Sequence, residues 1–225
     1  MPTILLVNPN TSQSVTDLIA ARAREAAAPG TVVRAVTAPF GSPYIASRGE
    51  NTVAAHATLA ALADHAEGCD AAVIAAFSDP GLAAAREQSA VPVVGIAEAA
   101  MLTACMLGGR FAILTIAPRL VPTIEELIHL YGLASRLASV RAVERSALDV
   151  LREPDAVADA LAALGRSAVA DDGADVLILG GAPLAALRDR VARQIDAPVL
   201  DGVACGLRQA ELLVALGVRP SGPGR

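Results

Sequence analysis

The chain contains an internal duplication whose two copies lie about 105 residues apart. The first copy spans residues 70–86 and the second spans 175–188. Each copy has an aspartate, an apolar run typical of a strand, a turn of small residues, a proline and a stretch typical of a helix. A short strand-like segment containing Pro-Val follows each copy, at 91–96 and 197–202. Two related halves predict a pseudo-twofold arrangement in which the equivalent turns face each other across a shared site.

A further echo, residues 4–11 against 111–118, places a strand ahead of each copy. Strand-like and helix-like segments alternate along the chain, which is typical of parallel sheets covered by helices. The apolar runs at 71–76 and 175–180 are continuous, as expected of strands buried on both faces. The predicted fold class is α/β, with two pseudo-symmetric Rossmann-like lobes, parallel sheets and a ligand site at the interface of the lobes.

Residues 1–97 together with 205–225 are expected to form lobe one, and residues 98–204 lobe two. Asp79 followed by Pro80 predicts a helix start, with the aspartate as cap and the proline at the first helical position. Strands are predicted near 3–8, 31–37, 71–76, 91–95, 111–116, 139–144, 175–180 and 197–200. Helices are predicted near 12–27, 51–67, 80–88, 97–107, 120–132, 153–171, 184–194 and 203–216.

Composition excludes several classes of function. The 18 basic residues are all arginines, which excludes pyridoxal-phosphate chemistry because that cofactor needs a lysine for its Schiff base. A net charge of −5, no basic cluster and few aromatic side chains argue against nucleic-acid binding. No apolar run approaches the roughly 18 residues of a membrane span, and the N-terminal segment lacks a signal-peptide pattern. We therefore expect a cytoplasmic protein without a membrane partner.

The spacing of cysteines and histidines predicts neither a metal site nor a cofactor site. The three cysteines form no CxxC pair, so the sequence supports neither a zinc site nor a disulfide framework. The three histidines show no metal-ligand spacing.

Polar and small residues follow four of the predicted strands. These strand ends lie at 8–11, 77–79, 115–117 and 180–182, and ligands collect at the carboxyl ends of parallel strands. Each end precedes a helix, whose free N–H groups and positive dipole end favour a carboxylate or an enolate-like oxygen. We therefore expect the site to be built from these strand ends.

Five ordered motifs resemble the aspartate/glutamate/hydantoin racemase superfamily, and most closely its hydantoin and allantoin racemase branch. They are Asn-Pro-Asn-Thr at 8–11 and the segments 76–82, 92–100, 110–115 and 198–203. The similarity runs from Ile4 to about Ala215. It implies a cofactor-independent racemase or isomerase acting at the carbon next to a carbonyl of a small hydantoin, amino-acid or dicarboxylate-like substrate. Because relatives of this kind commonly associate, a homo-oligomer is expected.

Members of this superfamily place one cysteine on each of the two equivalent turns. By motif, these positions fall on Ala76 and Gly181, and neither side chain can act as an acid or a base. Losing a positioned acid or base costs about 10²–10⁴ in rate, so a thiol-based racemisation is expected to be severely reduced. Four explanations stay open: divergence to another base or reaction, a deliberately mutated racemase, a binding protein that has lost catalysis, and a lyase or decarboxylase of the same superfamily.

Three side chains are candidates to supply the missing base. Ser78 lies two residues beyond Ala76, but a hydroxyl needs an activating neighbour and a turn serine is the simpler interpretation. Asp79 has the simpler interpretation of a helix cap. Cys205 is predicted near the start of a helix, where a thiol becomes more acidic, although a small buried residue is the simpler interpretation.

The expected substrate contacts come from loops and strand ends. Asn side chains suit an amide or a carboxylate, and Tyr44 belongs to a segment that resembles a family motif. Backbone N–H groups at 77–79 and 181–182 are expected to hold an enolate-like intermediate. The simpler interpretations are an Asx turn with a cap at 8–11 and a solvated Arg48. The full set of candidate contacts is Asn8, Asn10, Thr11, Tyr44, Arg48, Phe77, Thr115, Gly181 and Ala182.

Overall fold

The computed structural model describes residues 1–116 and 118–220. By its internal contacts the chain divides into two compact units. Unit 1 comprises Met1–Ala99 and Val203–Arg225, and unit 2 comprises Ala100–Gly202. Residues 221–225, which the sequence assigns to lobe one, and residue 117, in the strand end expected at 115–117, lie outside the described residues.

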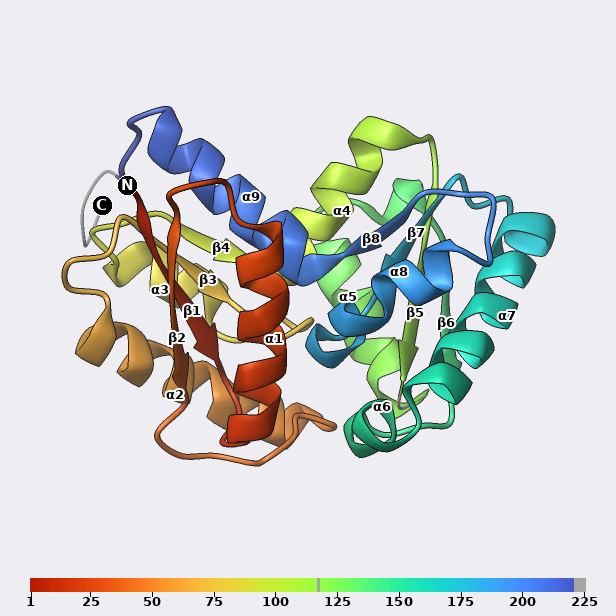
Figure 1. Cartoon of the computed structure of the whole chain (residues 1–225), viewed down its shortest axis with the longest axis horizontal. Coiled ribbons are helices and arrows are strands. Elements are labelled where there is room, and N and C mark those ends of the chain that lie inside the picture. The colour runs from red at the N-terminus through yellow and green to blue at the C-terminus, as the bar shows by residue number, and fades with distance from the viewer. Residues whose placement is uncertain (117, 221–225) are drawn as a thin grey trace. The chain divides into compact units, whose positions relative to one another are not determined.

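Unit 1 is built on a parallel four-stranded sheet of order β2-β1-β3-β4 (Figure 1). The path from β1 to β2 runs in the opposite direction along the sheet to the paths from β2 to β3 and on to β4. Right-handed crossovers therefore place α1 on one face of the sheet and α2 and α3 on the other. The elements are β1 (Thr3–Asn8), α1 (Gln13–Ala26), β2 (Val32–Thr37), α2 (Arg48–His65), β3 (Ala71–Ile74), α3 (Leu82–Gln88), β4 (Val93–Gly95), the start of α4 (Ile96–Leu107), and α9 (Gly202–Ala215).

Unit 2 repeats this arrangement, with a parallel sheet of order β6-β5-β7-β8 (Figure 1). The predicted α/β class with two related parallel sheets is confirmed. The elements are β5 (Phe111–Ile116), η1 (Pro118–Leu120), α5 (Val121–Leu130), η2 (Ala134–Arg136), β6 (Leu137–Val143), α6 (Ala147–Arg152), α7 (Pro154–Asp172), β7 (Val176–Leu179), η3 (Ala182–Leu187), α8 (Arg188–Ala192) and β8 (Val199–Asp201).

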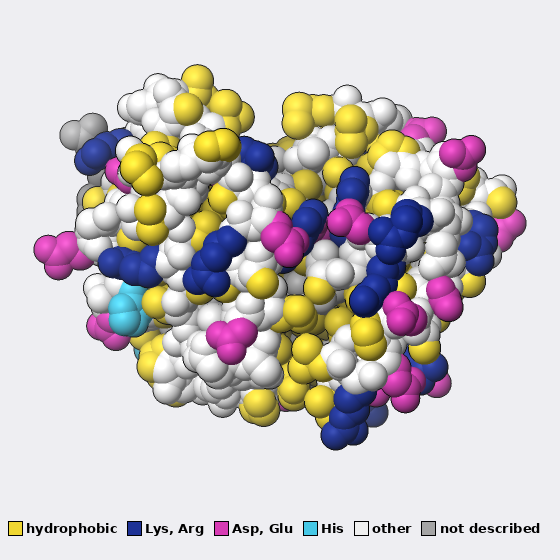
Figure 2. All heavy atoms as spheres, in the orientation of Figure 1, with side chains coloured by type: hydrophobic (Ala, Val, Ile, Leu, Met, Phe, Trp, Pro, Cys, Tyr) yellow, Lys and Arg dark blue, Asp and Glu magenta, His cyan; other side chains and the backbone are white. Residues whose placement is uncertain are grey.

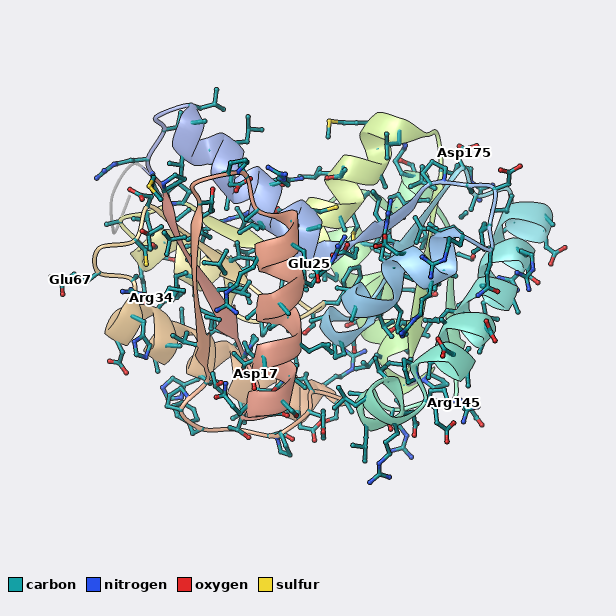
Figure 3. All side chains as sticks on the ribbon, in the orientation of Figure 1. Asp17, Glu25, Arg34, Glu67, Arg145 and Asp175 are labelled. Carbon is teal, nitrogen blue, oxygen red and sulfur yellow. The ribbon has the colours of Figure 1, made fainter. Side chains whose placement is uncertain are left out.

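The aspartate that opens each copy of the duplication has the same structural role in both units. Asp70 Oδ2 accepts the backbone N–H of Thr3 at 2.8 Å, and Asp175 Oδ2 accepts that of Arg110 at 2.9 Å. Asp175 is labelled in Figure 3 beside the start of its strand. Each carboxylate thus ties the entrance of one central strand to that of its neighbour, so the repeated aspartates are part of the sheet framework.

Strands β3 and β7 are buried along their whole length, as their continuous apolar sequences predict. Both sides of each strand are covered, so a polar side chain there would be costly. Polar residues consequently collect just beyond the strand ends, where the backbone turns toward the next helix.

Two helix starts differ from the prediction, and one short helix was not predicted. The helix expected at 153–171 is α7, which begins at Pro154, and the unpredicted α6 precedes it. The segment expected as one helix from 184 begins as the 3-10 turn η3. Asp79 does not cap α3, because that helix begins at Leu82 after Gly81, whose φ is +78°. Among the described residues, no helix combines the length and the hydropathy needed to cross a bilayer.

Candidate functional site

The end of β1 is organised by the buried side chain of Asn8. Its Nδ2 donates to Asn10 Oδ1 at 2.9 Å, to Thr16 Oγ1 at 2.9 Å and to the Ser12 carbonyl at 3.2 Å. A primary amide has two N–H donors, so these contacts use the donors of Asn8. Asn8 was predicted to contact a ligand, but the structure commits its amide nitrogen to the turn.

Asn10 is the amide that this turn leaves available. Its Oδ1 accepts from Asn8 Nδ2 and from the backbone N–H of Ser12 at 2.9 Å, which fixes the oxygen inward. Within residues 1–116 and 118–220, its Nδ2 has no hydrogen-bond acceptor. Because no fully buried side-chain nitrogen or oxygen among them lacks a partner, this Nδ2 is accessible and offers a fixed donor to a ligand oxygen.

The Glu50 carboxylate orders the loop from Ser42 to Ser47, and this loop is hydrogen-bonded to the turn that follows β1. The Glu50 carboxylate accepts from the Ala46 N–H and from the hydroxyls of Ser42 and Ser47. These bonds, led by that from Ala46, lower the pKa of Glu50 below its ordinary 4.5. The Ser42 carbonyl in turn accepts the Thr11 N–H at 3.1 Å.

The loop also carries two of the predicted contacts. Tyr44 is half-buried within it, and Arg48 is exposed at the first position of α2. The ordering role of Glu50 was not predicted. Its signal was the Ser-x-x-Glu capping pattern of Ser47 and Glu50.

The turn after β3 presents consecutive backbone donors. The Asp79 N–H closes the turn on the Ala76 carbonyl at 3.0 Å. Within the described part of the chain, the N–H groups of Ala76, Phe77 and Ser78 have no hydrogen-bond partner. Of the donors predicted at 77–79, the Asp79 N–H is used inside the turn, whereas those of Phe77 and Ser78 have no partner in the described chain and the Ala76 N–H joins them.

The turn after β7 is equivalent in hydrogen bonding but offers fewer donors. The Leu184 N–H closes this turn on the Gly181 carbonyl at 2.9 Å. The N–H groups of Gly181 and Ala182 have no partner among the described residues, and Pro183 has none to offer. The buried Thr115 hydroxyl donates to the Gly180 carbonyl at 2.6 Å. Thr115 therefore stabilises the residue that leads into this turn.

The three candidate bases are differently placed. Ser78 Oγ donates to Asn51 Oδ1 at 2.6 Å, and an amide oxygen is too weak a base to activate a hydroxyl. Asp79 is buried, and its two carboxylate oxygens accept backbone N–H bonds from Ala97 and Glu98. Both residues are therefore committed to structural contacts.

Cys205 is half-buried on α9 in unit 1. Cys69 lies elsewhere in unit 1 and is buried, and this burial raises the pKa of its thiol above the usual 9.0, which disfavours a thiolate at that position. Among the described residues no cluster of three or more His, Cys, Asp or Glu side chains is arranged to bind a metal ion.

Comparisons with known proteins agree over nearly the whole chain. The family model described as Asp/Glu/Hydantoin racemase matches residues 4–210. A hydantoin racemase from Pseudomonas sp. (strain NS671) is 36% identical over 97% of this chain and 88% of its own length.

Solved structures give the same result. An allantoin racemase from Klebsiella pneumoniae has a TM-score of 0.94 and 37% identity, covering 98% of this chain and 91% of that one. An allantoin racemase from Pseudomonas fluorescens also has a TM-score of 0.94, with 36% identity, and covers 97% and 93%. With its two parallel sheets of equal strand order and its matching turns, this chain belongs to the Asp/Glu/hydantoin racemase family of isomerases.

Proposed function

We propose that this racemase-family enzyme acts on a small cyclic ureide of the hydantoin or allantoin type, at the carbon next to a carbonyl. The observation that carries the proposal is the pair of equivalent turns, each of which leaves successive backbone N–H groups without partners at 76–78 and at 181–182. A hydantoin ring presents carbonyl oxygens that such donors fit. The names of the hydantoin and allantoin racemases to which the chain is similar support this substrate class.

Removing the proton from that carbon places negative charge on the adjacent carbonyl oxygen. Fixed N–H donors at Ala76, Phe77 and Ser78 would stabilise this charge without reorganising, and removing one donor of this kind typically costs about 10²–10³ in rate. Asn10 Nδ2 adds a side-chain donor at the neighbouring strand end. The substrate is therefore expected to direct the oxygen that gains charge toward the turn after β3, which has one more donor than its counterpart.

Proton transfer is the step for which this site is least equipped. Ala76 and Gly181, at the turn tips, provide no acid or base, and the Ser78 hydroxyl and the Asp79 carboxylate are committed to structural contacts. We propose that this protein performs slow proton exchange or slow racemisation, with strong binding of the enolate form. The second candidate function, a small-molecule binding protein, is favoured by the same lack of titratable groups at the tips.

Deuterium exchange separates these functions. The protein is incubated in D₂O with a 5-substituted hydantoin, allantoin or aspartate, and loss of the Cα–H signal is followed by NMR. Exchange above the buffer rate supports the enzyme. Thermal stabilisation by one of these ligands without any exchange would instead support the binding protein, and neither effect would reject both.

Cysteine replacement tests whether the turns after β3 and β7 can still support racemisation by two thiols. Gly181 has extended backbone with φ of 177°, and an added Cβ would lie 3.3 Å from Cγ and Cδ1 of Leu184, a flexible side chain that has to shift by a few tenths of an ångström. The double variant Ala76→Cys/Gly181→Cys is therefore expected to fold and to racemise at least about 10²-fold faster than the unaltered chain. Ala75→Cys, one residue before the tip, is the matched control. No gain in the double variant would indicate a pocket reshaped for another ligand.

We also propose that the protein self-associates. In unit 2, α4 exposes Leu102, Met106 and Leu107 at 44%, 77% and 55%, and Figure 2 shows apolar atoms at the surface over α4. Burying such side chains against a second copy would remove them from water. Light scattering should therefore give a mass above the 22.7 kDa of one chain, and a monomer at all concentrations would contradict the proposal.

A further inference from the structure

We infer that Asp79 is a positioning residue that locks the amide donors of the turn after β3 onto the start of α4. The inference deepens the proposed function, on which its kinetic test rests. Asp79 is the non-glycine residue with positive φ, +43°, in the described chain. Asp and Asn are the side chains that best tolerate this left-handed region, and such conformations persist where surrounding contacts hold them.

The side chain of Asp79 supplies that hold. Its Oδ1 accepts the Ala97 N–H at 3.0 Å and its Oδ2 accepts the Glu98 N–H at 2.9 Å. These are first-turn N–H groups of α4, which have no acceptor within the helix. One carboxylate therefore caps a helix that begins 17 residues later in the chain, instead of the helix that follows it.

Gly95 makes this contact possible. A Cβ built on Gly95 would lie 2.3 Å from Asp79 Cγ and 2.5 and 2.6 Å from its two oxygens. The last residue of β4 therefore has to be glycine while the carboxylate occupies this position. The backbone of Asp79 completes the lock, since its N–H bonds the Ala76 carbonyl and its carbonyl accepts the Leu82 N–H at 3.1 Å.

In the equivalent turn of unit 2 the closing residue is Leu184, whose side chain has no carboxylate to accept such bonds. The residue that pairs with the end of β7 is Asp201, where Gly95 pairs with the end of β3. The lock therefore serves the turn with three unpaired donors. Its consequence is that the direction of the donors at 76–78 depends on a contact with α4, and a loosened contact should lower the rate of proton exchange more than the affinity for substrate.

Three variants test the lock. Asp79→Gly removes the carboxylate while keeping the φ allowed, Gly95→Ala forces the carboxylate away, and the double variant removes the clash that Gly95→Ala creates. Asp70→Asn is the matched control, because it changes a carboxylate that also accepts a backbone N–H but lies at the opposite ends of the strands.

The first readout is amide hydrogen exchange, which needs no activity. We expect the Leu82, Ala97 and Glu98 amides to exchange at least about tenfold faster in each single variant and no faster in the double variant than in Asp79→Gly. Asp70→Asn should leave them unchanged. Wild-type exchange at these amides in Asp79→Gly, or additive effects in the double variant, would overturn the lock.

The second readout is hydantoin Cα–H exchange in D₂O. Asp79→Gly and Gly95→Ala should lower kcat at least tenfold and change KM less than threefold, whereas Asp70→Asn should change neither. Faster amide exchange with an unchanged kcat would reduce Asp79 to a helix cap and overturn its positioning role. If the wild type exchanges no ligand proton, the proposed function fails, and the amide data alone decide the lock.

Discussion

Asn8 Nδ2 donates to Thr16 Oγ1 at 2.9 Å, so a buried amide at the end of β1 is held by the first turns of α1. Thr16 Oγ1 in turn contacts Thr37 Oγ1 at 2.6 Å, and the Thr37 hydroxyl donates to Gln13 Oε1 at 2.8 Å. Gln13 Nε2 ends the chain on exposed Asp17, which is labelled in Figure 3. These contacts connect the buried Asn8 amide to side chains of α1 and β2, and such a network fixes the orientation of Asn8.

Thr16→Val should destabilise the protein by about 1–3 kcal/mol, because it leaves a buried amide donor of Asn8 without that acceptor. It should also weaken ligand binding through the loosened Asn10. Urea unfolding and ligand titration measure the two effects. Thr52→Val, which removes an exposed helical hydroxyl bonded to the Arg48 carbonyl, should change stability by less than about 0.5 kcal/mol. Equal losses in both variants would disprove the special role of Thr16.

Gly81→Ala should destabilise the protein more than Gly49→Ala. Gly81 has a φ of +78°, and an added Cβ would lie 2.9 Å from the Ala55 carbonyl oxygen of α2. Gly49 has open space around it and lies in the first turn of a helix, where alanine is favoured by up to about 1 kcal/mol. Thermal unfolding should therefore give a lower Tm for the first variant and an unchanged or higher Tm for the second.

Arg136→Ala should cost about 1–3 kcal/mol. Its guanidinium donates to the carbonyls of Cys105, Gly108 and Gly109, where α4 ends. Lysine should not restore the loss, because an ammonium cannot reproduce the forked donor geometry. Arg145→Ala, at an exposed position (Figure 3), is the control, and equal denaturation midpoints for the two alanine variants would contradict this account.

The Asp172 carboxylate should make the free energy of unfolding decrease at acidic pH. Hydrogen bonds from Arg141 and then Ser139 lower its pKa from 3.8 to about 2. Because the folded pKa is the lower one, the stabilisation is present above pH 4 and is lost as the pH falls from about 4 to 2. Asp172→Asn should lower the free energy of unfolding by on the order of 1 kcal/mol at pH 7 after solvent screening. It should also flatten the plot of unfolding free energy against pH between about pH 4 and 2, as measured by urea unfolding. Asp171→Asn, whose carboxylate is 66% exposed, should leave the profile unchanged.

Glu50→Gln should loosen the loop from Ser42 to Ser47 without unfolding α2. The neutral amide keeps one acceptor oxygen but presents N–H groups toward the Ala46 N–H and the serine hydroxyls. We expect faster amide exchange at Ala46 and a higher KM, with kcat retained. Glu67→Gln is the control, because it changes a carboxylate just beyond the C-terminal end of α2, labelled in Figure 3. An unchanged exchange rate at Ala46 would show that the loop is held by other contacts.

The fold could be predicted from local sequence because its framework repeats. The apolar runs of β3 and β7 are short, continuous and followed by small residues, which is a strong signal of buried parallel strands. The boundaries were less predictable. Asp79 and Pro80 have the pattern of a helix start, yet the chain needs the left-handed Gly81 before α3 begins.

The candidate site was predictable only in outline. The strand ends and the two turns follow from the topology rule for parallel sheets. The partners of Asp79, however, lie 18 and 19 residues away, and the donor state of the Asn8 and Asn10 amides depends on their packing. No spacing in the sequence encodes these contacts, because they are set by how α4 and α1 dock on the strands.

Unit 1 is discontinuous, since α9 returns to it after unit 2 has been completed. In that helix Glu211 accepts the Ala28 N–H at 2.8 Å and Gln209 donates to the Ala99 carbonyl at 2.8 Å. During synthesis the ribosome must make about 100 further residues after Ala99, which takes roughly 5–20 s. The half of the molecule that is translated first is therefore the last to receive its full set of helices.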